Sequence, residues 1–167
     1  MRTLIDGITY ISHDNPALRG EIHRMAMVDL APFDLRDTLE QLWLREDRAG
    51  RYEICCIPFL AYGLNLGDSV EIDDNDRVAR VLERSGRRTI RIAFSRERPA
   101  ADSRPLLAES ISRASIPSEW NDDHYVAISL QGPSEIDPIL NPISDEISRG
   151  TAFWEWADIK EFKIGNS

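Results

Sequence analysis

The sequence has little cysteine and no long apolar run. Its only cysteines, Cys55 and Cys56, are adjacent. In an extended segment their side chains would point to opposite faces, so an intrachain disulfide is not expected. No apolar stretch approaches the ~18 residues that a membrane-spanning helix requires, and residues 1–16 show no continuous apolar stretch of the kind found in secretory signals. We therefore expect a cytoplasmic protein, because unpaired cysteines are typical of reducing compartments.

The chain also lacks the residue patterns of common catalytic and metal sites. His13, His23 and His124 lie far apart, and no cysteine or histidine spacing matches a zinc site. The acidic turn at 73–76 lacks the glycine and the terminal glutamate of a calcium loop. A GxSxG nucleophile motif is missing, and the two cysteines lie in an apolar run, which favours a structural role. The sequence predicts no metal and no cofactor, and it favours a non-enzymatic protein.

Charge is plentiful but unevenly distributed along the chain. The 167 residues carry 29 acids and 20 bases, a formal net charge of −9, which argues against binding to anionic membranes or nucleic acids through bulk charge. The segment from Arg77 to Arg98 carries +6, whereas residues 1–76 and 99–167 carry −8 and −7. Because arginine pairs bidentately with carboxylates, we favour internal neutralisation of this segment over an open anion site. Aromatic residues are not interleaved with its arginines, so a nucleic-acid reader ranks last.

The first half of the chain predicts short strands joined by turns. We expect residues 1–20 to form an extension with little more than one short strand, and residues 21–86 to form an antiparallel β subdomain. A strand at 21–32 precedes two hairpin patterns, in which paired apolar runs flank a polar loop. These runs lie at 40–45 with 51–57, and at 68–72 with 77–83. The pattern predicts a small antiparallel β barrel or a rolled sheet.

The second half, residues 87–167, alternates strands with helical patterns. We expect strands at 89–94, 125–130 and 151–157, with a hairpin partner before 125, and helices at 103–114 and about 142–149. Ser103 is the expected N-cap of the first helix, and Gly150 closes the second. This order resembles the βαββαβ pattern of ferredoxin-like folds, so the fold class is α+β. Trp154 and Trp156 share one strand face, which favours core packing over an interface, while Trp120 is left open.

The sharpest local pattern spans residues 57–72. Pro58 ends a strand, and Gly63 and Gly67 permit turns. Phe59 and Tyr62 are suited to pack beneath the loop, with the tyrosine hydroxyl in water. Asp68 is expected to cap the turn into the next strand.

Four segments together resemble the core of a bacterial family of domains of unknown function: GluGlnLeuTrp at 40–43, IleProPheLeuAlaTyrGly at 57–63, GlyAspSerValGlu at 67–71 and GluArgSerGlyArgArgThrIleArgIle at 83–92. The family pattern is a Leu-Trp strand followed by Ile-Pro-Phe-Phe-Ala-Tyr-Gly, Gly-Asp-Val-Val-Glu and Arg-Ser-Gly-His-Thr-Arg-Val. Cys56, Ser69 and Arg87 depart from it, since they replace an asparagine, an apolar residue and a histidine. The resemblance extends through most of the chain and implies a shared fold, but it implies no established activity.

One weak ligand pattern lies between the two halves. Residues 85–89 combine a turn at Gly86 with two guanidinium groups and hydroxyls, the chemistry of a small anion nest. The segment precedes a strand rather than a helix, so we favour a tight connection. If a ligand site exists, we expect it at the junction of the halves, formed by Tyr62, Asp68, Glu83, Ser85, Arg88 and Arg91.

Two function hypotheses follow from these patterns. The first is a non-enzymatic acidic module that binds a protein with a basic surface, such as an immunity-type protein that neutralises a basic toxin domain. The second is a sensor or enzyme that binds a small anionic ligand at the junction. We favour the first, because catalytic motifs are missing and both flanks of the arginine segment are acidic.

Overall fold

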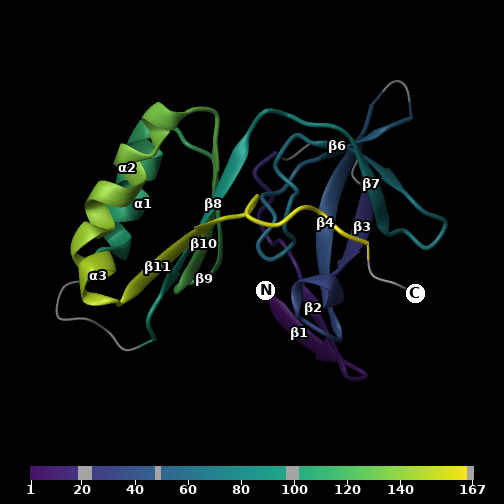
Figure 1. Cartoon of the computed structure of the whole chain (residues 1–167), viewed down its shortest axis with the longest axis horizontal. Helices are drawn as coiled ribbons and strands as arrows, with labels where there is room; N and C mark the ends of the chain where they lie inside the picture. The colour runs from purple at the N-terminus through teal and green to yellow at the C-terminus, as the bar shows by residue number, and fades with distance from the viewer. Residues whose placement is uncertain (19–23, 48–49, 97–101, 165–167) are drawn as a thin grey trace.

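The chain folds into two β-sheets that lie side by side, with a layer of helices on the outer face of the second sheet (Figure 1). The computed structural model describes residues 1–18, 24–47, 50–96 and 102–164. The mixed α and β content expected from the sequence is confirmed. No helix in the described part of the chain is long and apolar enough to cross a membrane.

The first sheet contains seven strands: β1 (Arg2–Ile5), β2 (Ile8–Ile11), β3 (Arg24–Asp29), β4 (Thr38–Glu46), β5 (Tyr52–Ile54), β6 (Ser69–Ile72) and β7 (Val78–Glu83). Their order is β1-β2-β4-β5-β6-β7, and β3 pairs with β4. A 3-10 turn at Ala31–Phe33 follows β3. Both predicted hairpins are confirmed, because β5 pairs antiparallel with β4 and β7 pairs antiparallel with β6.

The N-terminal segment differs from expectation. Residues 1–18 contribute a complete hairpin, β1 with β2, rather than little more than one strand. Its turn uses Asp6 and Gly7, both at positive φ, and Ile11 is buried against the centre of the molecule. Strand β2 lies parallel to β4, so the sheet is not wholly antiparallel. The end strands β1 and β7 do not pair with each other, so the described strands form no closed barrel.

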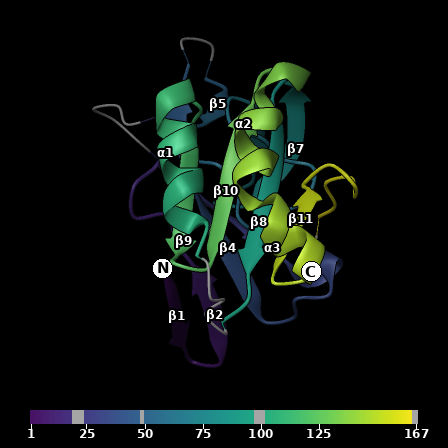
Figure 2. The same ribbon diagram turned by 90° about the vertical axis from the view of Figure 1, so that its left-hand side faces the viewer.

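The second sheet and its helices follow the predicted order. The elements are β8 (Arg88–Phe94), α1 (Arg104–Ala114), β9 (Ser118–Asp122), β10 (Tyr125–Leu130), α2 (Asp137–Leu140), α3 (Ser144–Arg149) and β11 (Ala152–Trp156). Short 3-10 turns at Pro133–Glu135 and Asn141–Ile143 flank α2. The strand order is β11-β8-β10-β9, with every pair antiparallel. Figure 2 shows α1, α2 and α3 lying across one face of this sheet.

Successive side chains of β8 face two different environments. Ile90, Ile92 and Phe94 pack against the helix layer, as the sequence predicted. Arg91 occupies the opposite face, which is turned toward the first sheet, where it contacts the backbone of residues 60–61. A polar strand face is therefore buried between the two sheets.

Capping at α1 differs from the prediction. Ser103 precedes the helix, but its side chain makes no cap hydrogen bond to the helix backbone. Instead its hydroxyl donates to the buried carboxylate of Glu146 on α3, at 2.6 Å, and its backbone N–H donates to the same oxygen at 2.8 Å. This contact ties the two helices together. The predicted closure of α3 by Gly150 is confirmed, with a φ of 71°.

The tryptophans are more exposed than predicted. Trp154 on β11 is 40% exposed, so the core assignment is wrong for this residue, whereas Trp156 is partly buried against the second core. The physical reason is the position of β11, which is an edge strand of its sheet. Trp120 is 36% exposed and stacks on Phe94.

Candidate functional site

The residues predicted to share a ligand site occupy three separate places. Asp68 is fully buried, and its carboxylate accepts hydrogen bonds from the backbone of Asn65 and Ser85 and from Arg84. Its oxygens are thus occupied by the turn that it was expected to cap. Glu83 is exposed and faces Arg51 at 3.4 Å.

Arg88 is the first residue of β8 and makes a different set of contacts. Its guanidinium donates two hydrogen bonds to Asp158, at 2.7 and 2.9 Å, and lies 4.0 Å from the ring centroid of Trp156. The hydrogen bonds from Arg88 lower the pKa of Asp158 below its usual range, although partial burial opposes the shift. Gly86 and Arg88 line a hollow of about 230 Å³ beside the 3-10 turn at Pro133–Glu135.

The arginine-rich segment is largely neutralised within the chain. Five of its arginines pair with carboxylates: Arg77 with Asp29, Arg80 with Glu71, Arg84 with Asp68, Arg88 with Asp158 and Arg91 with Glu155. The favoured interpretation of this segment is confirmed for these five. Arg98 lies outside the described residues. Most of these pairs are exposed and stabilise the fold little individually.

Tyr62 and Arg91 are a second pair of predicted ligand residues that the fold brings together, besides Asp68 and Ser85. The Tyr62 hydroxyl donates to the Glu155 carboxylate, at 2.8 and 3.0 Å to its two oxygens. The Arg91 guanidinium lies 4.7 Å from the centroid of the Tyr62 ring and 3.5 Å from Glu155. Burial and the hydrogen bond to Glu155 raise the pKa of Tyr62, which keeps the phenol protonated.

A groove of about 320 Å³ opens beside this pair, between β11 and the loop after β5. It is lined by Leu60, Arg91, Ala93, Tyr125, Phe153, Trp154 and Glu155. Arg91 is only 1% exposed, and its Nε atom has no hydrogen-bond partner among the described residues. Phe153 is 60% exposed. The groove therefore combines aromatic walls with one buried cation and one accessible carboxylate.

The loop at 57–63, which forms one side of the groove, is held from beneath by Glu40. This carboxylate is completely buried and accepts the backbone N–H groups of Phe59, Leu60 and Ala61, at 2.5, 3.0 and 2.6 Å. Glu40 precedes Leu42 and Leu44 on the inward face of β4. A carboxylate on an apolar strand face is costly unless it is hydrogen-bonded, and here three donors converge on it.

His13 connects Glu40 with a second buried carboxylate. Its Nε2 lies 3.1 Å from Glu40 and its Nδ1 lies 2.6 Å from Glu119 on β9. The Glu119 carboxylate also accepts the backbone N–H groups of Ala17 and Ile57. The imidazole stacks on Phe59, with ring centroids 4.2 Å apart. We call His13, Glu40 and Glu119 the buried triad; it links the N-terminal segment, the first sheet and the second sheet.

Sequence reasoning missed the buried triad. The sequence offers His13 only for comparison with metal-ligand spacings, which it does not match, and His23 lies outside the described residues. One signal was present, because Glu40 falls in register with the apolar positions 42 and 44 of a predicted strand. Glu119 and His13 carried no comparable signal, since their burial depends on the packing of the two sheets. The described residues contain no group of three or more side chains arranged to hold a metal ion.

The two cysteines have the structural role that the sequence favoured. Both are buried and free. Burial raises the pKa of Cys55 to about 11, so its thiol is not a nucleophile near neutral pH. Burial also raises the pKa of Cys56, whose Sγ accepts a hydrogen bond from the backbone of Trp43.

The buried triad predicts a pH dependence of stability. Burial lowers the pKa of His13, but contacts with Cys56, Glu119 and Glu40 outweigh it and raise the pKa well above its ordinary value. The folded state then holds a proton that the unfolded chain releases near pH ~6.5. This stabilisation is complete below that pH and is lost as the pH rises toward the folded-state pKa, with a slope of up to about 1.4 kcal/mol per pH unit.

Urea unfolding measures this slope. The free energy of unfolding is determined at several pH values between neutral and alkaline, for the wild type and for His13→Gln. The wild type should lose stability with rising pH faster than the variant does. Nitrogen-15 NMR of the imidazole provides an independent measurement, and it should show protons on both ring nitrogens at neutral pH. A neutral imidazole at that pH would contradict the prediction.

A comparison with protein-family models supports the expectation of a domain of unknown function. A family model described as Domain of unknown function (DUF4265) matches residues 40–154, a range that includes Glu40, the loop at 57–63 and Glu119. A solved structure, a hypothetical protein from Neisseria gonorrhoeae, is similar with a TM-score of 0.59 and 18% identity over 89% of this chain and 100% of that chain. At this identity the similarity supports the fold alone. No curated protein matches. Because the family model matches more than half of the sequence, the chain belongs to the DUF4265 family.

Proposed function

We propose that this chain is a non-enzymatic protein-binding module that recognises a partner with a basic surface, in the manner of an immunity-type protein that masks a basic toxin domain. The observation that carries the proposal is the pairing of five segment arginines with carboxylates of the same chain. Cations that are already paired offer a poor site for an anionic ligand. The net charge of −9 then favours encounter with a cationic partner.

The acids that remain for such a partner are spread over the surface. Among the described residues, seven acids are exposed and make no ion pair: Asp6, Asp37, Glu46, Asp74, Asp122, Asp137 and Glu161. Scattered charges speed an encounter but do not define a contact surface. Four other acids, Glu40, Asp68, Glu119 and Glu146, are buried and serve the fold.

Two experiments test the proposal. The partner is captured from an extract of the producing cell, and the association and dissociation rates of the purified pair are then measured. We expect a partner with an excess of basic residues whose association rate falls steeply with salt while its dissociation rate changes little. Changing the seven unpaired acids to their amides should slow association. The matched control changes the paired exposed acids Glu109 and Asp145, which already have cationic neighbours. An acidic partner, or association insensitive to salt, would contradict the proposal, and a bound toxin that remains toxic would contradict the immunity-type role.

A small anionic ligand is the second candidate function, and one observation favours it. Arg91 is buried beside the groove and its Nε lacks a partner among the described residues. A carboxylate or phosphate that displaced Glu155 would meet this guanidinium. Thermal unfolding with a panel of phosphates and carboxylates tests it, because a ligand at about 100 times its dissociation constant adds about 2.7 kcal/mol. Equal melting temperatures across the panel would exclude this site.

We also propose that the first half is a rolled sheet, that the second half is ferredoxin-like and that the protein is cytoplasmic. An isolated bridge between Met27 and Arg77 brings β3 toward β7, which supports a rolled sheet in the first half. The order β8-α1-β9-β10-α2-β11 supports a ferredoxin-like second half. Two free cysteines fit a reducing compartment.

A further inference from the structure

Strand β11 is an edge strand with unused backbone groups. It lies at one end of the order β11-β8-β10-β9. The N–H of Ser95 donates to Thr151, and the N–H of Ala157 donates to Thr89, so positions 151 and 157 are bonded to the neighbouring strand. Bonded and non-bonded positions alternate in an antiparallel pair. The N–H and C=O of Trp154 and the N–H of Trp156 therefore point to the open side of the strand.

The sequence of this edge offers little protection against pairing. Natural edge strands are usually shielded by charges, proline or bulges, whereas β11 reads Ala-Phe-Trp-Glu-Trp. Its single charge, Glu155, is turned toward Tyr62 and Arg91. Phe153 and Trp154 are exposed on opposite faces. In Figure 1 the strand lies at the near side of its sheet, and the segment beyond it crosses to the first sheet.

The groove adds a specific recognition element to this edge. A strand added beside β11 would place alternate side chains over the groove face, where the aromatic walls come from Tyr125 and Phe153. Glu155 is the accessible charge there, because its side chain is 36% exposed while that of Arg91 is 1% exposed. An ionised carboxylate accepts about four hydrogen bonds, so the bonds from Tyr62 and Arg91 leave Glu155 able to accept a further donor. A lysine or arginine would lay its apolar stem against the aromatic rings and direct its cation to Glu155.

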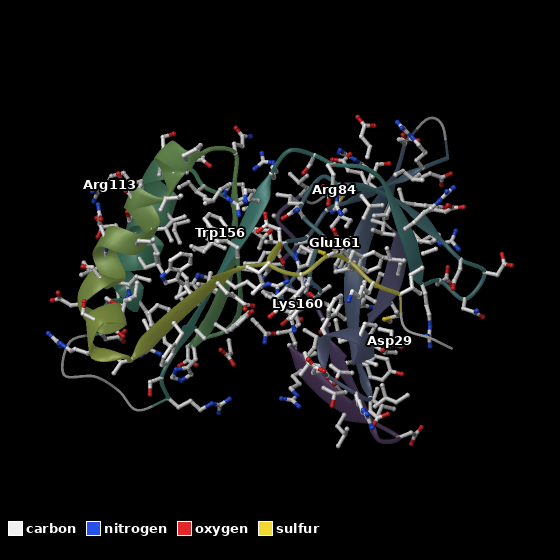
Figure 3. All side chains as sticks on the ribbon, in the orientation of Figure 1. Asp29, Arg84, Arg113, Trp156, Lys160 and Glu161 are labelled. Carbon is white, nitrogen blue, oxygen red and sulfur yellow. The ribbon has the colours of Figure 1, made fainter. Side chains whose placement is uncertain are left out.

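We infer that β11 binds an extended segment of the basic partner by strand addition, with a lysine or arginine of that segment seated in the groove of Phe153, Tyr125 and Glu155. This inference rests on the proposed function and names the contact surface. A second copy of the chain is disfavoured as the occupant, because each copy carries a net charge of −9. Figure 3 shows Trp156 at the end of β11, and Lys160 and Glu161 on the segment that follows it.

Amide hydrogen exchange with a synthetic peptide of alternating lysine and valine tests the inference. We expect slower exchange at the N–H groups of Trp154 and Trp156 when the peptide is bound. A peptide of alternating glutamate and valine, at the same concentration, should not produce this change. Protection confined to another edge, such as β1, or equal protection by the glutamate peptide, would overturn the inference. Dimerisation through β11 in the absence of peptide would also overturn it.

Two variants at one position separate the backbone from the side chain. Trp154→Ala removes the aromatic ring and keeps the N–H, whereas Trp154→Pro removes both and leaves the pairing with β8 intact. We expect the proline variant to bind the lysine peptide about tenfold more weakly than the alanine variant. Leu106→Ala, which changes an exposed leucine of α1, is the control and should bind like the wild type.

Equal binding by the two Trp154 variants would overturn strand addition. If a basic partner still binds both variants equally, the proposed function stands and only the contact surface is wrong. If the proline variant does not fold, the exchange measurement on the wild type decides the inference by itself.

Discussion

Replacing Glu40 with alanine is expected to lower the free energy of unfolding by about 4 kcal/mol, because breaking a buried ion pair from one side costs about 3–5 kcal/mol. The substitution leaves the N–H groups of Phe59, Leu60 and Ala61 without their acceptor. It also removes one of the two carboxylates that contact the His13 imidazole. Burial would raise the pKa of Glu40, but the hydrogen bond and charge of His13, together with the charge of Arg91, lower it. The group is therefore ionised when the protein is folded.

Urea denaturation measures this effect, and the same strand provides its control. Glu46 is exposed on β4, and Glu46→Ala should change stability by less than about 0.5 kcal/mol. Glu40→Gln should fall between the two, because its amide keeps one acceptor oxygen but places N–H groups against backbone donors. If Glu40→Ala costs no more than Glu46→Ala, the loop at 57–63 does not depend on this carboxylate.

The Gly63→Ala substitution is expected to destabilise the fold by about 3 kcal/mol or more, because it combines a left-handed backbone with a steric overlap. Gly63 has a φ of +69°, and an added Cβ would overlap the backbone nitrogen of Phe162. Phe162 packs on the first core, and the N–H of Gly63 donates to Ala157. The C-terminal segment would have to lift from the loop to make room.

Gly86 provides a matched control for the backbone contribution. It has a φ of +80°, and no atom lies within 4 Å of an added Cβ. Gly86→Ala should therefore cost only about 1–2 kcal/mol, the penalty of the left-handed conformation. Thermal or urea unfolding of both variants isolates the steric part as their difference. Equal losses would show that the contact between Gly63 and the C-terminal segment contributes nothing.

Local features of the fold were predictable because they depend on neighbouring residues. The alternation of Ile90, Ile92 and Phe94 identified β8, and polar turns identified both hairpins. The parallel pairing of β2 with β4 was not predictable, because it joins segments with a long connection between them. The exposure of Trp154 depends on strand order, which alternation within one strand does not reveal.

The candidate site was predictable only in part. Tyr62 and Arg91 were expected at the junction and do meet there, whereas Asp68 contacts Ser85, Glu83 faces Arg51 and Arg88 pairs with Asp158. Their contacts are set by how the two sheets face each other, which no sequence spacing encodes. The buried triad was missed for the same reason. Glu119 meets His13 only because the second sheet packs over the N-terminal segment.

The partner's dissociation constant for an edge variant tests the central claim most directly. Phe153→Ser with Trp154→Ser removes the two exposed aromatic side chains of β11, and Leu82→Ser with Leu106→Ser removes two exposed leucines elsewhere. We predict that the edge pair weakens binding by about 30-fold or more, as expected for aromatic residues at the centre of an interface, while the leucine pair leaves binding unchanged. Equal affinities of the edge variant and the wild type for the basic partner would contradict the assignment of β11 as the binding edge.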